Sequence, residues 1–324
     1  MPAPTTLFRA SWDAAELTAR HPPVFKHPNK RVVQEVACPP GSTAAGTVTV
    51  SRWRDDGLPG VGRGELRVRV REGYYPYEPD APATIGWYQN FADEHVFGYY
   101  AGGLFAQDEA QVSEHPALVS VREALVAAGH ALSAERGAPT PVLVTGVERR
   151  VVVDTEPSLD PGRMQGLYGN RFATASPEVI RSASRRIDPA TRSNIVAMAA
   201  PTPASGTYTV AQIGRILLTA YTGYAAAVAE SASVAPTAAV VMHTGFWGCG
   251  AFGGNRTLMV AAQILAARWA GVSELVLHVG ARPGLHDAAE AQSVANALPA
   301  SVPLADVMTM LEARRFQWGR SDGN

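Results

Sequence analysis

The chain has 324 residues, of which 46% are hydrophobic and 18% are charged, and its formal net charge is -1 at pH 7. This composition is typical of a folded globular protein, and it excludes a strongly basic surface whose long-range field would attract polyanions. The two cysteines, Cys38 and Cys249, exclude a disulfide framework and a cysteine-rich zinc site. A cytoplasmic location is therefore expected.

Neither a membrane nor a nucleic acid is expected as a stable partner. Residues 1–15 contain prolines and charged residues that interrupt any apolar core of a signal peptide. The most apolar windows, residues 213–228 and 258–269, have helical periodicity and are too short for a bilayer about 30 Å thick. Scattered solvated arginines explain the local basic stretches as well as nucleic-acid contact does. These stretches are residues 149–150, 181–192 and 314–315.

The first 80 residues differ in character from the rest. They carry many prolines and glycines, and only the alternating run at residues 64–71 predicts a half-buried strand. No low-complexity linker follows them. We expect residues 1–80 to form an irregular N-terminal accessory region that packs on a domain of residues 81–324.

From about residue 85, short apolar runs alternate with helical segments, and this pattern favours an α/β layer fold. Uninterrupted apolar runs are expected of strands covered on both faces, which indicates a mixed or mostly parallel sheet. The predicted strands are residues 142–144, 150–154, 194–199, 238–243 and 274–279. The predicted helices, which have apolar positions three and four apart, are residues 116–128, 210–230, 256–270, 286–298 and 304–316.

The first candidate site segment is a glycine-containing loop, residues 89–109, that ends in an acidic pair. Gly98 and the glycines at 102–103 let main-chain N–H groups approach an anion, as in phosphate-binding loops. Asp108 and Glu109 supply two carboxyl groups. From these residues alone, an ordinary glycine loop and a solvated helix start explain the segment at least as well.

The second candidate segment, residues 243–255, lies between a predicted strand and a predicted helix, where α/β folds bind phosphates. It has five glycines in the eleven residues that begin with Gly245, and Asn255 is a natural N-cap for the helix. A tight strand-to-helix turn is the alternative explanation. So many glycines beside a helix N-terminus favour a site for a diphosphate.

Both segments resemble the signature of the poly(ADP-ribose) glycohydrolase family of macrodomains. Phe91-Ala92-Asp93, Gln107-Asp108-Glu109 and Pro116-Ala117-Leu118 stand, without a gap, where the family has Phe-Ala-Asn, Gln-Glu-Glu and Pro-Glu-Leu. Residues 244–255 are similar to the family run Thr-Gly-Asn-Trp-Gly-Cys-Gly-Ala-Phe-Gly-Gly-Asp, with differences at Phe246 and Asn255. With two shorter similar stretches, the resemblance covers residues 85–118 and about 194–280.

The resemblance implies a macrodomain-like mixed sheet flanked by helices and an activity that hydrolyses ADP-ribosyl linkages. By this similarity Glu109, with Asp108 beside it, is the catalytic acid/base that protonates the leaving group and then activates water. Crowding by Asp108 would raise the pKa of Glu109 toward a useful range. The resemblance further implies substrate binding, with Phe252 against the distal ribose, by Asn90, Asp93, Gly98, Gln107, Gly248, Cys249, Gly250, Ala251 and Phe252.

Three departures from the family pattern bear on the substrate. Asp93 replaces an asparagine that holds the ribose, so a donor amide becomes an acceptor. Phe97 and Tyr99 replace glycines and are expected to narrow the diphosphate cleft. Asp108 is one methylene shorter than the family's glutamate. We therefore expect a terminal or mono-ADP-ribosyl group on a protein or a nucleic-acid base as the substrate.

Other features of the site stay open. Tyr168 is the candidate for stacking on adenine, with Tyr99 and Tyr100 as competitors. Cys249 is interpreted as a buried loop residue, since no activating base is evident. No metal or cofactor is expected, because the histidines lack ligand spacing with acids. The alternatives are a poly(ADP-ribose) exo- or endo-glycohydrolase, a non-catalytic ADP-ribose-binding module, and a structural nucleotide-binding module.

Overall fold

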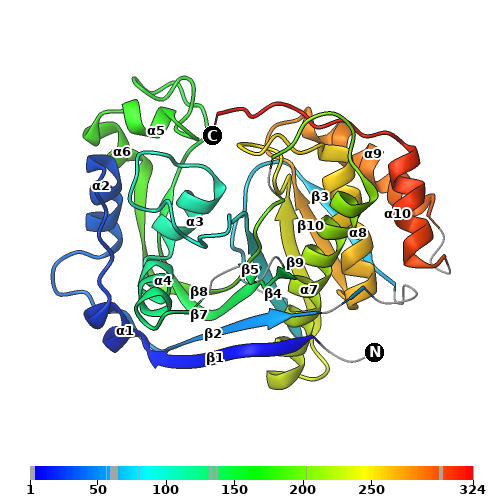
Figure 1. The fold of residues 1–324 in the computed structure, drawn as a ribbon. Coiled ribbons are helices and arrows are strands. Elements are labelled where there is room, and N and C mark those ends of the chain that lie inside the picture. The colour runs from blue at the N-terminus through cyan, green and yellow to red at the C-terminus, as the bar shows by residue number, and fades with distance from the viewer. Residues whose placement is uncertain are drawn as a thin grey trace.

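One mixed eight-stranded sheet forms the centre of the computed structural model (Figure 1). The structure describes residues 4–55, 57–58, 65–79, 81–130, 134–135, 138–201, 203–298 and 302–323. The strand order is β1-β2-β7-β8-β4-β9-β10-β3. The strands are β1 (Thr5–Asp13), β2 (Thr47–Arg54), β3 (Arg67–Arg71), β4 (Thr84–Asn90), β7 (Val142–Val153), β8 (Ser184–Ala197), β9 (Ala239–Gly245) and β10 (Glu274–His278). A separate short hairpin pairs β5 (Ala134–Glu135) with β6 (Ala138–Pro139).

The strands β8, β4, β9, β10 and β3 run parallel, whereas β1, β2 and β7 pair antiparallel with their neighbours. The expected mixed α/β sheet is therefore confirmed. Because parallel neighbours end at one edge, the loops that follow β4, β9 and β10 meet there. That edge carries the candidate site.

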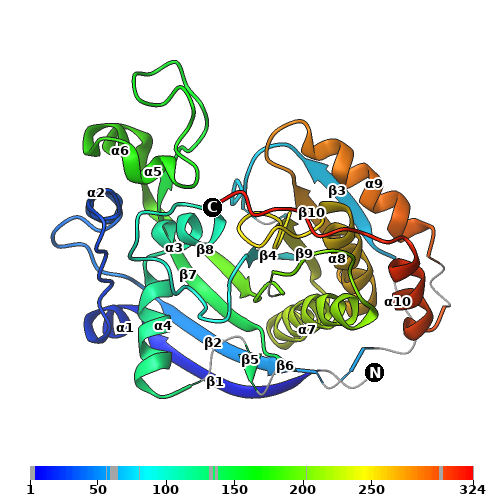
Figure 2. The same ribbon diagram turned by 45° about the horizontal axis from the view of Figure 1, so that its top comes forward.

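Helices cover both faces of the sheet (Figures 1 and 2). One layer consists of α7 (Val210–Val234), α8 (Arg256–Ala270), α9 (Gly284–Asn296) and α10 (Leu304–Ala313). The other side holds α1 (Ala14–Arg20), α2 (Pro28–Ala37), α3 (Gln107–Glu114), α4 (Ala117–Ala127), α5 (Arg171–Thr174) and α6 (Pro177–Ala183). Adjacent residues of β4 divide between the two cores, since Trp87 packs with the α7–α8 core and Tyr88 with the α1–α4 core. Within the described ranges, no helix has both the length and the apolar character needed to cross a bilayer.

The predicted helices match α4, α7, α8, α9 and α10, and α8 has the predicted bounds. Two predicted strands, residues 142–144 and 150–154, are halves of the single strand β7. Residues 145–149 separate the two predicted strands, and their polar side chains interrupt the apolar pattern that would predict one continuous strand. Register shifts near Gly146 and Arg149 bend β7, and Arg149 is buried against Glu114 instead of facing solvent. The predicted strand at residues 194–199 is the apolar end of β8, whose first half is polar and largely exposed.

Residues 1–80 differ from the expected irregular region. They contribute β1, β2 and β3 to the main sheet, and strand pairing of β2 with β7 and of β3 with β10 joins them to later residues. The predicted strand at residues 64–71 is confirmed over Arg67–Arg71, while Gly64 lies outside the described residues. The apolar alternation that predicts strands is weak in β1, because it is an edge strand with few buried side chains.

Candidate active site

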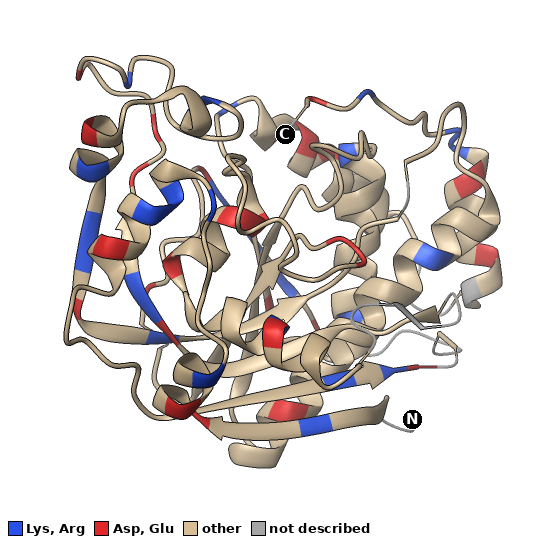
Figure 3. Cartoon of the chain, turned by 60° about the vertical axis from the view of Figure 1, so that its left-hand side comes forward, with Lys and Arg blue, Asp and Glu red and all other residues tan. Residues whose placement is uncertain are grey.

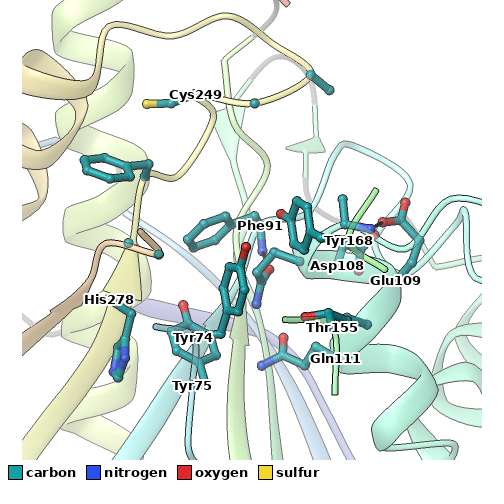
Figure 4. A pocket seen from close by; sticks show the side chains of 18 of the residues that line it. Tyr74, Tyr75, Phe91, Asp108, Glu109, Gln111, Thr155, Tyr168, Cys249 and His278 are labelled. Carbon is teal, nitrogen blue, oxygen red and sulfur yellow. Dashed lines mark hydrogen bonds between the residues drawn. The ribbon is translucent and has the colours of Figure 1, made fainter. Parts of the chain in front are cut away.

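The two candidate segments converge at the carboxyl ends of β4 and β9. These neighbouring parallel strands end at Asn90 and Gly245, so the loops that follow them, leading to α3 and α8, leave the sheet side by side. A cavity of about 890 Å³ lies between these loops, large enough for a nucleotide-sized ligand. Figure 4 shows Cys249 on one side of this cavity and Asp108 and Glu109 on another.

Most of the predicted site residues line this one cavity. They are Asp93, Gln107, Asp108, Glu109, Tyr168, Gly248, Cys249, Gly250, Ala251 and Phe252. Asn90 and Gly98 are not among the described residues that line it. Asn90 is buried, and its Nδ2 donates a hydrogen bond to Asp108 Oδ1 at 2.9 Å. It therefore contacts the acidic pair from outside the cavity lining. Gly98 lies against His95, where a Cβ on residue 98 would be 2.8 Å from the His95 Cβ.

The acidic pair forms the first turn of α3 and is buried. Asp108 is 8% exposed and Glu109 is 4% exposed, so the alternative of a solvated helix start is wrong. Glu109 Oε2 accepts a hydrogen bond from the Ala106 N–H at 3.1 Å, which holds its side chain along the helix start. Burial raises the pKa of Glu109, and burial together with the charge of Glu109 raises the pKa of Asp108. A carboxyl group held above its ordinary pKa is suited to both donating and accepting a proton near neutral pH.

Gln107 fixes the start of α3 to the end of β4. Its Oε1 accepts from the Phe91 N–H at 2.7 Å, and its Nε2 donates to Gln89 O at 3.1 Å. Asp93 lines the cavity, and its Oδ1 accepts from the His95 N–H at 2.8 Å. These bonds fix the loop after β4 in place before any ligand binds.

The expectation that Phe97 narrows the cleft is wrong. Phe97 is 1% exposed and packs into the core beneath α4, with a φ of 58° that few side chains other than glycine adopt readily. Tyr99 does line the cavity, and its side chain stays 56% exposed. The altered glycine triplet therefore adds one aromatic ring to the cavity wall and buries the other.

The loop after β9 depends on its glycines for close approach. A Cβ at Gly245 would lie 2.5 Å from His278 O on the neighbouring strand, and Gly248 has a φ of 72°. Trp247 anchors the loop from beneath, because it is buried and its Nε1 donates to Met198 O at 3.1 Å. Asn255 Oδ1 accepts from the Leu258 N–H at 3.0 Å, so the predicted N-cap is confirmed.

Cys249 and the tyrosines differ in what they offer a ligand. Burial raises the pKa of the Cys249 thiol, which disfavours a thiolate nucleophile. Tyr168 lines the cavity and stacks on Tyr74, with ring centroids 5.2 Å apart and planes 4° from parallel. Tyr100 instead packs edge-on against Phe25, and its hydroxyl donates to Glu123, which directs it away from the cavity.

Several parts of the cavity wall were not predicted from the sequence, and two of them are described here. Tyr74 lines the cavity because its neighbour Gly73 pairs with Gly280 just beyond β10. The sequence feature that could have indicated Tyr74 is its position shortly after the predicted strand at residues 64–71. The other part is the C-terminal segment Ser321–Gly323, which crosses from the glycine loop toward α5 (red in Figure 1). Gly319 N donates to Gly253 O at 2.8 Å, and Asn170 Nδ2 donates to Gly323 O at 2.6 Å. No sequence pattern indicated this crossing.

Some arginines of the three basic stretches are paired with acidic residues in the described part of the chain. Arg149 is buried and pairs with Glu114 at 2.8 Å, and Arg186 lies 3.5 Å from Asp188. Positive and negative segments are interspersed on the face seen in Figure 3. These pairs account for Arg149 and Arg186, and the absence of stable nucleic-acid binding stays a prediction.

Comparison with known proteins places part of the chain in a family. The family model described as poly(ADP-ribose) glycohydrolase, macro domain fold, matches residues 163–282, a range that contains Tyr168 and the loop after β9 but not Glu109. No curated protein matches the chain.

Among the solved structures that are similar to the chain are two poly(ADP-ribose) glycohydrolases. Poly(ADP-ribose) glycohydrolase from Thermomonospora curvata is 15% identical, with a TM-score of 0.47, over 82% of this chain and 98% of that one. The Deinococcus radiodurans glycohydrolase in complex with ADP-ribose is 12% identical, with a TM-score of 0.40, over 89% and 95%. The family match covers residues 163–282, less than half of the 324-residue chain, and this part is similar to the poly(ADP-ribose) glycohydrolase family model of the macro domain fold.

Proposed function

We propose that this protein is a hydrolase that binds ADP-ribose and cleaves the C1″ ribosyl linkage, with Glu109 as general acid/base. The observation that carries the proposal is that the buried Glu109 carboxyl and the glycine loop at residues 248–252 line a single cavity. A diphosphate bound along that loop would direct one ribose toward α3. A match of the family model to the loop after β9 supports the same assignment.

The proposed reaction uses one carboxyl group twice. Protonated Glu109 gives its proton to the leaving-group oxygen or nitrogen as the C1″ bond breaks, and the Glu109 carboxylate then takes a proton from the water that attacks C1″. The products are free ADP-ribose and the acceptor with its proton restored. The Asn90 bond to Asp108 holds the neighbouring carboxyl in a fixed position during both steps.

We place the parts of the ligand as follows. The diphosphate lies along Gly248–Phe252 and the distal ribose lies near Asp93 and Phe252, while the adenine ring stacks at Tyr168. The Tyr74 ring is stacked parallel to Tyr168. Water is the co-substrate, and no metal or cofactor takes part in the proposal.

We further propose a terminal or mono-ADP-ribosyl substrate, attached to a protein or a nucleic-acid base. The motives are Asp93 in place of an asparagine and the Tyr99 ring in the cavity wall. The buried, raised-pKa Glu109 speaks against the alternative of a non-catalytic module. The alternative of a poly(ADP-ribose) exo- or endo-glycohydrolase makes a different prediction for polymer, which the experiment below tests.

The test compares wild type, Glu109→Gln and the control Glu16→Gln, whose carboxyl on α1 is largely exposed. Each is incubated with poly(ADP-ribose), ADP-ribosylated protein and ADP-ribosylated DNA, and free ADP-ribose is measured. Glu109→Gln should release ADP-ribose about 10²–10⁴-fold more slowly because the proton donor is lost. Its Kd for ADP-ribose, measured by calorimetry, should change little.

Three outcomes would contradict parts of the proposal. Full activity of Glu109→Gln on every cleaved substrate would refute the mechanism. Tight ADP-ribose binding by a wild type that cleaves nothing would identify a non-catalytic module. Equal release from long polymer and from mono-modified targets would refute the substrate preference alone.

A further inference from the structure

Lys30 is a buried amine beside the candidate active site. It lies on α2, in the N-terminal part of the chain, and is 1% exposed. Its Nζ has no hydrogen-bond partner among the residues that the structure describes. Lysine is rarely buried without a partner because removing its charge from water costs several kcal/mol. A compensating interaction is therefore required.

Aromatic rings hold the Lys30 amine in place. Its Nζ lies 5.0 Å from the centre of the Phe105 ring and 5.9 Å from that of Phe172, and these two rings are stacked. Phe105 comes directly before Ala106, the N-cap residue of α3. The contact with Phe105 thus places the amine behind the turn of chain that carries Asp108 and Glu109.

The charges that act on Lys30 are those of the acidic pair. Burial lowers the pKa of Lys30 to about 8, and the Glu109 and Asp108 carboxylates oppose that effect. In return, Lys30 is the largest influence that lowers the pKa of Glu109 against its burial. Further titratable groups interact with this cluster. Asp93 raises the pKa of both carboxyls, and Lys30 adds to burial in lowering the pKa of His27. The charge of Glu109 also contributes, after larger causes, to the raised pKa of Tyr99 and of Tyr168.

We propose that Lys30 is a positioning residue of the active site, whose buried positive charge balances the carboxyl groups of Asp108 and Glu109 from behind the Phe105 ring. The proposal rests on the proposed role of Glu109. It gives the N-terminal region a function, because α2 brings the Lys30 charge to the acidic pair. Without this charge, the two carboxyl groups hold their protons to higher pH.

The first test compares two variants. Lys30→Met keeps an unbranched side chain of similar length and removes the charge, whereas Lys30→Arg keeps the charge. A general acid must be protonated, so kcat/KM falls as the pH rises through the pKa of Glu109. In Lys30→Met this alkaline limb should move up by about one pH unit, and in Lys30→Arg it should stay within about 0.3 unit of wild type. If Lys30 had only a structural role, Lys30→Met would lower kcat/KM without shifting the pH at which kcat/KM falls. An unmoved limb in Lys30→Met, or equal shifts in both variants, would overturn the proposal.

A second test needs no enzyme activity and no Lys30 substitution. NMR of ¹⁵N-labelled lysine follows the titration of Lys30 Nζ in wild type and in Glu109→Gln. Loss of the attracting carboxylate should lower the Lys30 pKa below its wild-type value, because the coupling between two sites is reciprocal. The matched control, Glu16→Gln, should leave it unchanged.

The two tests separate this proposal from the proposed function. If no ADP-ribosyl substrate is cleaved but Lys30 titration responds to Glu109→Gln, the function fails and the charge coupling stands. If ADP-ribose is released but Lys30 titration does not respond, the function stands and Lys30 has no part in it.

Discussion

Asp108 and Glu109 illustrate how one residue's environment changes its chemistry. Adjacent acidic residues at a helix start are ordinarily solvated and complement the helix dipole. Here both side chains are buried, Glu109 accepts from the Ala106 N–H, and Asp108 accepts from Asn90. A buried carboxyl group gains a proton more readily, so burial alone turns a common helix-capping pattern into a candidate acid/base pair.

Stability should therefore depend on pH through Asp108. Because its pKa is raised in the folded state above the ordinary 3.8, the folded chain binds more protons than the unfolded chain above about pH 4. Asp108 thus lowers the free energy of unfolding as the pH rises through this window, by at most about 1.4 kcal/mol per pH unit. Asp108→Asn removes the titrating carboxyl group. The free energy of unfolding of this variant, relative to that of wild type, should therefore increase from pH 5 to pH 7.

Urea unfolding at several pH values measures this difference. Asp306→Asn, at an exposed position of α10, serves as the control and should follow the wild-type pH dependence. A constant difference between Asp108→Asn and wild type across this range would contradict the raised pKa.

At the scale of elements, the C-terminal segment closes one side of the cavity. Asp322 N donates to Gly250 O at 3.4 Å, and the Asp322 carboxylate oxygens lie 3.4 and 3.5 Å from where a Cβ on Gly250 would stand. Burial is the main cause of the raised pKa of Tyr168 and of Cys249, and the charge of Asp322 adds to both shifts. The segment thus brings a negative charge to the loop proposed to bind a diphosphate.

Asp322→Asn should bind ADP-ribose more tightly than wild type. Like charges a few ångströms apart repel by roughly 1 kcal/mol or more near a protein surface, so the Kd should fall at least about fivefold. The gain should shrink as salt is raised, because salt screens exposed charges. Calorimetry at low and high ionic strength measures both effects, with Glu16→Gln as the distant control. An unchanged Kd at low salt would contradict a diphosphate bound beside Asp322.

At the scale of the whole molecule, the N-terminal residues belong to the main sheet. β2 pairs with β7 and β3 pairs with β10, and Val48, Val50 and Trp53 of β2 are buried in the two cores. Residues 81–324 on their own would leave the edges of β7 and β10 unpaired and apolar surface exposed.

Residues 81–324 expressed alone should therefore lack cooperative unfolding. Urea titration followed by near-ultraviolet circular dichroism should give a broad transition or a weak initial signal, compared with a single sharp transition for the full chain. A sharp transition at the same urea midpoint as the full chain would instead establish residues 81–324 as an independent domain.

The sequence by itself determined the helices α7 and α8, the apolar strands β9 and β10, and the two segments that meet at the cavity. These features depend on local periodicity, capping and glycine content, which act between residues close in the chain. The sequence also indicated Asp108 and Glu109, through their place in a family signature.

Only the tertiary structure decided the course of β7, the strands of residues 1–80, and the places of Lys30, Tyr74 and Asp322 beside the cavity. The local sequence predicts a solvated Arg149 and a cleft-lining Phe97, whereas Arg149 pairs with Glu114 and the Phe97 ring lies in the core. The physical reason is common to all of them. Burial and charge pairing depend on which distant segments pack together, and no local pattern in the chain records that choice.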